Sequence, residues 1–371
     1  LIAASWYMAS KSLHPIPFDS FTDPEARLRR RSTDLLVHPD QMQNLRLRTA
    51  VIKALRARLD AEGFLEVETP ILHTVHGGAS ARPFRTYINA YGEDLTLRIA
   101  PELYLKRLVV GGSGPVYELG RDFRNEGADA THNPEFTVLE AYRPYADYVQ
   151  MRELTERLIK DAAWAVFGSV SLPLGRKASS ERVVRDVSGP WRVVSVCDAL
   201  SEALGRRVDV QTDFEELLAL AQQHGVRVHE GMGPGAIVEE LYGELVEAHT
   251  VEPTFYTDFP AETSPLAAPH RSVPGLAERW DLVINGMEMG CAYSELADPL
   301  VQRERLTEQS LKAASGDLEA MEVDEDFLYA LETGMPPTGG LGLGVDRLVM
   351  LLAQTQIRGV LSFPFVKPER S

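Results

Sequence analysis

Cysteine is scarce in this sequence: its 371 residues include only two, Cys197 and Cys291. So few thiols exclude a disulfide scaffold and a cysteine-rich zinc site, and they favour a reducing compartment. No apolar run approaches the roughly 18 residues of a transmembrane helix. The first residues, LIAASWYMASKS, lack a basic segment followed by an apolar one, which argues against a signal peptide. We therefore expect a cytoplasmic location for this chain.

Positive charge is also in deficit, with 38 Lys and Arg against 54 Asp and Glu and a net charge of -16. This balance argues against a protein whose main task is to grip nucleic acid, because such surfaces are usually basic. It does not exclude a local basic groove, since net charge does not report how charge is distributed. Carboxylates that bind a cation or Mg²⁺ would also make the net charge of the chain negative.

The helical part of the chain can be predicted from hydrophobic spacing and breaker residues. Apolar residues recur at helical spacing in residues 41–62 and again in 150–167. Residues 171–190 are polar and rich in Gly, Pro and Ser, which predicts a loop. Residues 195–250 alternate short helical stretches with glycines and predict a helical insertion.

Strand character recurs in residues 95–100, 116–124 and 136–143, with turn residues between them. Hairpin-like strands with few βαβ units predict an antiparallel sheet flanked by helices, and therefore an α+β fold. Residues 1–35 contain Pro-rich turns, a helix start at Asp23-Pro24 and an arginine cluster, which together predict a connector. The first residue is not Met, and we expect a fragment of a longer protein.

Many functional groups are concentrated in residues 121–142, RDFRNEG…HNPEFTVLEAY. Side chains two residues apart in a strand share a face, so Phe136, Glu140 and Tyr142 are expected to point the same way. Burying Glu140 beside aromatic rings is costly without a cation. The segment therefore predicts either a structural salt bridge or a site for a cationic ligand.

Three acidic residues, Asp281, Glu288 and Glu295, recur at intervals of seven. The turn dipeptide Asn285-Gly286 predicts a hairpin that would place Asp281 and Glu288 on adjacent strands. Mg²⁺ is commonly held by one or two carboxylates together with substrate phosphates. The segment predicts an Mg²⁺ site at these two residues, with a solvated strand edge as the alternative.

Glycines alternate in GGLGLGVDR, residues 339–347. Such glycines allow a ligand or another backbone to approach closely, and an arginine that opens a helix suits a phosphate group. The run is neither a Walker A loop nor a dinucleotide fingerprint. It predicts either a phosphate site at Arg347 or a close-packed crossing of two segments.

The three segments match one family in order and spacing. From about residue 7 to residue 367 the chain resembles the catalytic domain of class II aminoacyl-tRNA synthetases, and specifically the lysyl enzyme. LRIAPELYLKR, FRNEG, HNPEFT and MPPTGGLGLGVDR carry the resemblance. It implies a six-stranded antiparallel sheet with flanking helices, and a homodimer built on the first motif, which ends at Pro70. It also implies that residues 1–35 are the connector and remnant of a missing N-terminal OB-fold, and that 36–367 form the catalytic domain.

The resemblance further implies that ATP activates L-lysine to lysyl-adenylate, with Mg²⁺ as cofactor, and that the lysyl group passes to tRNA(Lys). The implied catalytic residues are Arg124, between the lysine carboxylate and the α-phosphate, and Arg347, at the γ-phosphate. The other implied ATP contacts are Glu126, His132, Phe136 (stacked on adenine), Asp281 and Glu288, and the last two are also the implied metal ligands. The implied lysine contacts are Gly78, Glu102, Arg124, Glu140, Tyr142, Cys291, Tyr293, Glu295 and Gly342.

Among these, Glu102 and the Gly78 backbone are matched to the α-amino group, and Glu140, Tyr142, Tyr293 and Glu295 to the ε-ammonium group. A pocket with two carboxylates accepts an ammonium group, repels aspartate and leaves buried anions uncompensated with asparagine. Cys291 departs from the Asn or Thr usual in the family, and we expect a weaker hydrogen bond to lysine there.

Two other functions are open for a chain of this kind. The first is a tRNA-independent lysyl ligase that modifies a translation elongation factor, a family that also lacks the OB-fold. Its members carry bulkier residues where this chain has Ala100 and Gly342. The second is an inactive synthetase paralogue that acts as a lysine or ATP binding module, against which the intact arginines, carboxylates and Phe136 argue.

Strings such as VEPTFYTDFP and CAYSELADP are similar to the synthetase half of actinobacterial bifunctional proteins, in which a membrane-embedded lysylphosphatidylglycerol synthase precedes a lysyl-tRNA synthetase. In that setting lysyl-tRNA would feed lipid lysylation, which protects against cationic peptides. This chain would then lie in the cytosol and meet the membrane only through an upstream domain that it does not contain. A free-standing synthetase is the alternative.

Overall fold

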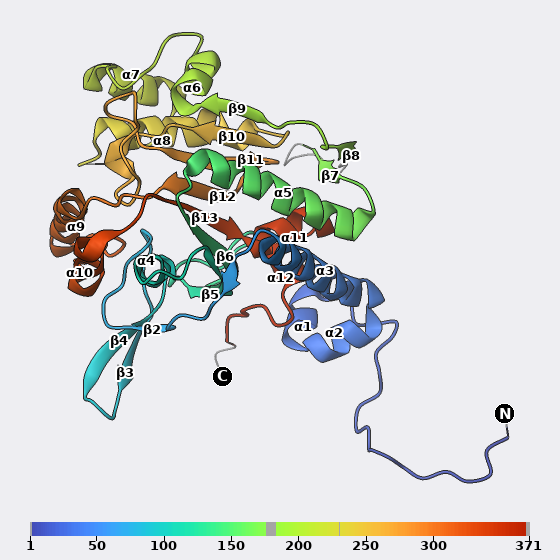
Figure 1. Cartoon of the computed structure of the whole chain (residues 1–371). Coiled ribbons are helices and arrows are strands. Elements are labelled where there is room, and N and C mark those ends of the chain that lie inside the picture. Colours follow the sequence, from blue (N-terminus) through green and yellow to red (C-terminus); the bar gives the residue numbers. More distant parts are fainter. Residues whose placement is uncertain (1, 176–182, 230, 369–371) are drawn as a thin grey trace.

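The computed structural model describes residues 2–175, 183–229 and 231–368 (Figure 1). A sheet of eight strands runs through the centre of the molecule. In spatial order its strands are β1 (Leu65–Glu66), β5 (Val116–Phe123), β6 (Glu135–Pro144), β13 (Thr338–Gly344), β12 (Met287–Ser294), β11 (Arg279–Ile284), β10 (Thr254–Thr257) and β9 (Arg192–Ser195).

The central strands from β5 to β10 pair antiparallel, as the family resemblance implies. The prediction of a purely antiparallel six-stranded sheet is wrong at both edges, because β1 pairs parallel with β5 and β9 pairs parallel with β10. A parallel neighbour needs a long crossover connection, and both edge strands are followed by one. The predicted α+β class, with helices packed on a large sheet, is confirmed.

One face of this sheet is apolar and is covered by long helices (Figure 1). The helices are α3 (Pro39–Ala61), α5 (Tyr148–Phe167) and α11 (Val345–Ala353), and α12 (Ile357–Val360) follows α11. The predicted helices in 41–62 and 150–167 are therefore confirmed. A capping box of Asp147 and Gln150 begins α5. Alternate strand residues such as Leu139 and Leu341 point into this core and leave the residues between them on the opposite, polar face.

A second layer of helices lies beside the polar face. It consists of α4 (Glu102–Val110), α9 (Pro299–Ala314) and α10 (Glu325–Gly334). Leu103 of α4 packs with Phe327 and Leu328 of α10 in a small apolar cluster. Next to α4 lies a small sheet of β2 (Leu72–His73), β4 (Glu93–Leu97) and β3 (Arg85–Ile88).

The predicted helices in 195–250 are also present. They are α6 (Val196–Leu204), α7 (Phe214–His224), α8 (Pro234–Leu245) and the short 3-10 helix η1 (Glu247–His249); a second 3-10 turn, η2 (Ala261–Thr263), follows β10. These helices share an apolar cluster of their own, which includes Tyr256 of β10 and Val283 of β11. The segment therefore packs on the β10 and β11 end of the sheet.

Residues 171–190 are not simply the loop that their polar composition predicts. β7 (Ser171–Leu174) and β8 (Val183–Asp186) pair antiparallel, because Leu172 and Leu174 alternate into the main core and pull the backbone into strand geometry. Residues 187–190 are without helix or strand, as predicted, and 176–182 lie outside the described residues.

The N-terminal part of the chain, where residues 1–35 are predicted to be a connector, contains two short helices, α1 (Pro24–Arg29) and α2 (Arg31–Val37). The predicted helix start is confirmed, since the Asp23 side chain accepts a hydrogen bond from the Ala26 amide at the N-terminus of α1. Within the described residues, no helix combines the length and the apolar character needed to span a membrane.

Candidate active site

Two rows of paired residues cross the polar face of the sheet. The first row runs through Glu140 of β6, Gly342 of β13, Cys291 of β12 and Asp281 of β11. The second row runs through Tyr142, Gly340, Tyr293 and Arg279 of the same strands. Because cross-strand partners share a face, strand pairing brings together residues from three distant parts of the sequence.

The glycines of β13 form the floor between these side chains. A Cβ atom on Gly340 would lie 2.6 Å from Cε1 of Tyr142 and would overlap the Glu295 carboxylate. A Cβ atom on Gly342 would meet only Cys291 Sγ, at 3.9 Å. Gly340 is therefore required so that the Glu295 carboxylate can lie across β13 beside Tyr142.

Glu102 and Glu295, which were matched to opposite ends of lysine, share one ammonium group of the chain itself. Lys106 Nζ lies 2.6 Å from a carboxylate oxygen of Glu102 and also contacts Glu295. Burial lowers the pKa of Lys106, but the two carboxylates outweigh it and raise that pKa above its ordinary value. One ammonium cannot neutralise both carboxylates, and burial together with Glu102 raises the pKa of Glu295 to about 8.

Glu140 is buried, and its one hydrogen bond in the described structure is donated by the Tyr142 hydroxyl at 3.0 Å. Burial, and then repulsion by Asp122 and Glu102, raise the pKa of Glu140 well above its ordinary value. Glu140 forms no ion pair among the described residues, so of the two predicted alternatives the geometry favours a site for a cationic ligand over a structural salt bridge. A ligand ammonium beside it would remove this cost.

A cavity of about 90 Å³ lies beside these carboxylates. Its walls include three residues matched to lysine, namely Gly78, Glu102 and Tyr293. Gly78 has a φ of +88°, and its Cβ would lie 3.1 Å from Cβ of Glu102 and 3.2 Å from that of Ala100, so glycine allows this backbone to approach α4. The sequence did not point to five other residues that line this cavity, namely Thr263, Ser264, Pro265, Leu266 and Ala267.

Arg124 lies over the ring of Phe136, with its guanidinium carbon 5.2 Å from the ring centre. Its Nε is buried and has no hydrogen-bond partner among the described residues. A buried guanidinium nitrogen without a partner suits an incoming anion. Glu126 follows on the exposed part of the hairpin loop, where its amide donates to the Arg124 carbonyl oxygen at 2.8 Å.

The structure also brings His132, Glu288 and Arg347 together. Arg347 donates to the Glu288 carbonyl oxygen at 2.7 Å and lies 3.5 Å from the Glu288 carboxylate. Its other terminal nitrogen lies 3.5 Å from His132 Nε2. His132 Nδ1 is oriented by Asp129 at 3.0 Å. The residues matched to the triphosphate therefore form one partly exposed cluster.

The two predicted metal ligands lie on paired strands, β11 and β12, on either side of the Asn285-Gly286 turn. Burial, opposed by Arg279 and reinforced by Glu288, raises the pKa of Asp281 to about 7. Two neighbouring carboxylates, one of them costly to ionise when buried, fit a divalent cation. No group of three or more His, Cys, Asp or Glu side chains suited to a metal occurs in the described ranges. Further ligands would have to come from substrate.

Cys291 lies in the first row, between the residues matched to lysine and the predicted metal ligand Asp281, and its Sγ is 3.4 Å from the Tyr293 hydroxyl. Burial, followed by the charges of Glu288 and Asp281, raises the pKa of its thiol. Cys291 therefore remains a protonated thiol with only a weak polar contact.

Sequence reasoning missed several charged residues that organise the site. Lys106 could have been found from its position one helical turn after Glu102, and Arg279 from its position two strand residues before Asp281. Arg279 pairs with Asp281 at 2.8 Å and with Glu239 of α8 at 3.0 Å, so it connects the helical segment to the site. The buried Arg98 pairs with Glu118 at 2.6 Å.

Asp346 links the three signature segments. Its carboxylate accepts a hydrogen bond from the Thr137 amide at 2.8 Å and pairs with Arg48 of α3. Arg48 in turn donates to the Thr137 hydroxyl at 2.7 Å. This buried network holds α3, β6 and α11 in register beneath the site.

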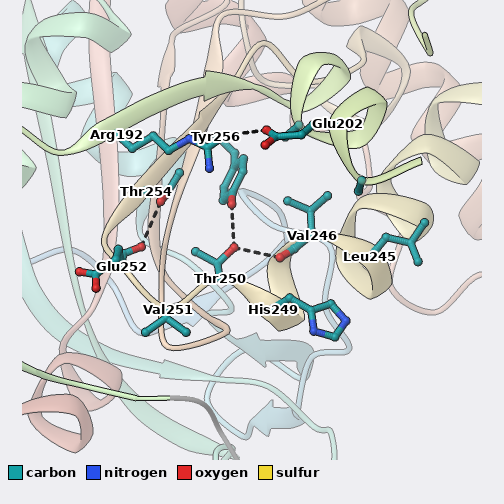
Figure 2. A pocket seen from close by; sticks show the side chains of 12 residues that line it. Arg192, Glu202, Leu245, Val246, His249, Thr250, Val251, Glu252, Thr254 and Tyr256 are labelled. Atoms are coloured by element: carbon teal, nitrogen blue, oxygen red, sulfur yellow. Dashed lines mark hydrogen bonds and ion pairs between the residues drawn. The ribbon is translucent and has the colours of Figure 1, made fainter. Parts of the chain in front are cut away.

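A larger groove of about 450 Å³ lies where α6 and α8 meet β9 and β10 (Figure 2). Its polar groups pair with one another: the Thr250 and Tyr256 hydroxyls lie 2.7 Å apart, and Arg192 contacts Glu202 at 2.9 Å. None of the residues predicted for the site lines this groove. The candidate site therefore remains at the smaller cavity on the polar face.

Comparison with known proteins agrees with this arrangement. The family model for tRNA synthetases class II (D, K and N) matches residues 23–367. The chain is 56% identical over 371 residues to the lysylphosphatidylglycerol biosynthesis bifunctional protein LysX of Nocardia farcinica (strain IFM 10152), a match that covers 99% of this chain and 33% of that protein. For LysX of Rhodococcus opacus (strain B4) the identity is 52% over 373 residues, covering 100% of this chain and 33% of that protein.

A third relative, LysX of Mycobacterium marinum (strain ATCC BAA-535 / M), is 55% identical over 372 residues, which cover 99% of this chain and 33% of that protein. The chain thus spans about a third of the length of these curated relatives. The family match covers all three signature segments and the polar face that they build. The chain therefore belongs to the class II tRNA synthetases of the D, K and N group.

Proposed function

We propose that this chain activates L-lysine with ATP and transfers the lysyl group to tRNA(Lys). Membership of the class II synthetases supports an ATP-dependent ligase, and the proposal selects lysine among the amino acids of the family. The observation that carries it is the pair of buried carboxylates, Glu140 and Glu295, on either side of Tyr142. Neither has a full cationic charge to itself, so a ligand ammonium would be stabilised there, whereas the side-chain carboxylate of aspartate would be repelled.

In the first step an oxygen of the lysine carboxylate attacks the α-phosphorus of ATP. The bond from that phosphorus to the oxygen bridging to the β-phosphate breaks, and pyrophosphate leaves. The substrate supplies the nucleophile, so the protein needs to align two anions and stabilise the charge that develops. Arg124 is suited to the carboxylate and α-phosphate, and Arg347 to the departing phosphates.

Asp281 and Glu288 would hold Mg²⁺, which supplies charge neutralisation to the phosphates when it is bound. In the second step a terminal ribose hydroxyl of tRNA attacks the lysyl carbonyl carbon, and AMP leaves. We assign no side chain as general base to this step. We also propose that two chains form a homodimer through the first motif, where Leu65 is about half exposed.

The names of the relatives favour a lipid-related role for the product. We propose that this chain is the cytosolic synthetase part of a longer membrane-anchored protein, in which lysyl-tRNA made here supplies lysylphosphatidylglycerol synthesis. The full-length protein should lysylate phosphatidylglycerol vesicles when ATP, lysine and tRNA(Lys) are supplied. Loss of tRNA should abolish that product.

ATP–pyrophosphate exchange with L-lysine, L-aspartate and L-asparagine tests the proposed specificity. We expect exchange with lysine alone, followed by charging of tRNA(Lys). Exchange with aspartate or asparagine in place of lysine would contradict the proposal. Exchange with lysine but no charging of tRNA would favour a ligase with a protein acceptor, and no exchange with any amino acid would favour a binding module.

A further inference from the structure

Lys106 is a charged residue at the amino-acid pocket to which the proposed reaction assigns no task. It lies on α4, one helical turn after Glu102, and its side chain is 0% exposed. Its Nζ contacts Glu102 at 2.6 Å and also contacts Glu295. Apart from this ion pair, the carboxylate oxygens of Glu295 have no hydrogen-bond partner among the described residues. The position of that carboxylate therefore depends on Lys106.

With its carboxylates ionised and without a ligand, the pocket carries more negative than positive charge. Glu102, Glu140 and Glu295 are three buried carboxylates, and the ammonium group of Lys106 contacts two of them, Glu102 and Glu295. Arg98 is engaged elsewhere, because it pairs with Glu118 at 2.6 Å and contacts Asp122 at 3.2 Å. When all three carboxylates are ionised, two negative charges remain uncompensated. L-lysine carries two ammonium groups, which would compensate both.

We propose that Lys106 is a positioning residue that sets amino-acid specificity. Its ammonium group fixes the positions of the Glu102 and Glu295 carboxylates and neutralises one of the three negative charges at the pocket. The two negative charges that remain match a substrate with two ammonium groups. The inference rests on the proposed function and deepens it, since it explains how selection for a diammonium substrate is built into α4.

The opposite role, a lysine side chain that fills the place of the substrate and must move away, fits the geometry less well. Lys106 is absent from the walls of the cavity, whereas Glu102 and Tyr293 form part of them. Its Nζ lies 6.0 Å from the centre of the Phe327 ring, on α10, which packs against α4. Lys106 thus reaches the carboxylates from the helical layer.

The test replaces Lys106 with Met and measures lysine-dependent ATP–pyrophosphate exchange. Lys106→Met should raise KM for L-lysine about tenfold or more while KM for ATP changes less than about twofold, because the carboxylates lose their fixed positions and the nucleotide end keeps its own. Discrimination between L-lysine and the shorter L-ornithine should also fall about tenfold, since a freed Glu295 can follow a shorter side chain. A purely structural role would reduce activity with both amino acids equally.

Lys160→Met is the matched control. Lys160 forms the same one-turn ion pair, 2.6 Å from Glu156 on α5, away from the pocket. Lys160→Met should leave KM for L-lysine, KM for ATP and the discrimination between lysine and ornithine unchanged. If Lys106→Met fails to fold, Lys106→Arg keeps the charge but displaces both carboxylates with its larger head group, and KM for lysine should rise severalfold.

An unchanged or lower KM for lysine in a folded Lys106 variant, with an unchanged ornithine ratio, would overturn the inference. An equal loss with both amino acids would do so as well. The proposed function fails separately: it fails if the unaltered protein shows no lysine-dependent exchange, a result that is obtained before any variant is compared.

Discussion

Arg347 donates a 2.7 Å hydrogen bond to the main-chain carbonyl oxygen of Glu288, and this contact joins the start of α11 to β12. One terminal nitrogen of the guanidinium group is thereby fixed by the protein backbone. The other lies 3.5 Å from His132 and is open to a ligand. Preorganisation of this kind lets a cation stabilise developing charge without first having to reorient.

Arg347→Ala should lower kcat of ATP–pyrophosphate exchange about a hundredfold, the range seen when one preorganised charge-stabilising donor is lost. KM for lysine should change little, because Arg347 is assigned to the proposed nucleotide end of the site. Arg303→Ala, which removes a surface pair with Glu325, is the control and should be neutral. Steady-state kinetics with each substrate varied in turn provide the measurement. A nearly normal kcat in Arg347→Ala would contradict the assigned role.

Glu140→Gln should abolish lysine activation while ATP binding survives. The amide keeps the size of the side chain and its contact with Tyr142 but removes the charge that would face the ε-ammonium. We expect KM for lysine to rise at least about a hundredfold, in line with the cost of leaving one member of a buried ion pair without its partner. Glu156→Gln on α5 serves as the control. Near-normal turnover of lysine in Glu140→Gln would refute the pocket assignment.

Lysine binding should strengthen as pH rises from about 6.5 to 8.5. Burial raises the pKa of Glu295 to about 8, so this carboxylate largely holds a proton at neutral pH in the free protein, and burial together with Asp122 and Glu102 raises the pKa of Glu140 in the same direction. An incoming ammonium favours the ionised forms and expels bound protons. KM should therefore fall by up to about tenfold per pH unit for each proton released. Calorimetry in two buffers of different ionisation enthalpy would detect the release, and a flat pH profile would contradict it.

Two alanine substitutions on β13 should have different effects. Gly340→Ala places a methyl group against Tyr142 and the Glu295 carboxylate, so both thermal stability and lysine affinity should fall. Gly342→Ala meets only Cys291 Sγ at 3.9 Å, so stability should stay close to the unaltered value. Its methyl group nevertheless enters the predicted ligand space and should raise KM for lysine. Thermal melts combined with exchange kinetics separate the two effects, and identical behaviour of the two variants would argue against the position assigned to lysine.

The local parts of the fold could be predicted because they depend on short-range patterns. Residues 41–62 repeat apolar side chains at helical spacing, and Asn285-Gly286 forms the hairpin turn that its residue types favour. The parallel edge pairs could not be predicted in this way. Leu65 meets Val116, and Arg192 meets Thr254, only after long crossovers, and no local residue pattern specifies such a partner.

The polar composition of 171–190 was misleading for a similar reason. Leu172 and Leu174 are apolar residues in a polar stretch, and their burial against the main core outweighs local preference. Local sequence likewise does not reveal which charged residues form ion pairs with each other. The sequence suggested that Glu102 and Glu295 bind substrate, but not that both already contact Lys106, because Glu295 lies on a distant segment.

By itself, the order of residues determined which side chains alternate on each strand, in which regions the long helices form, and which chemical groups are available to bind an amino acid and a nucleotide. These properties follow from backbone periodicity and from the chemistry of single side chains. Tertiary structure alone decided that Glu140, Gly342, Cys291 and Asp281 lie in one row and that Lys106 is shared by two carboxylates. Pairing between distant strands and the electrostatic cost of burial arise only once the chain has folded around a common core.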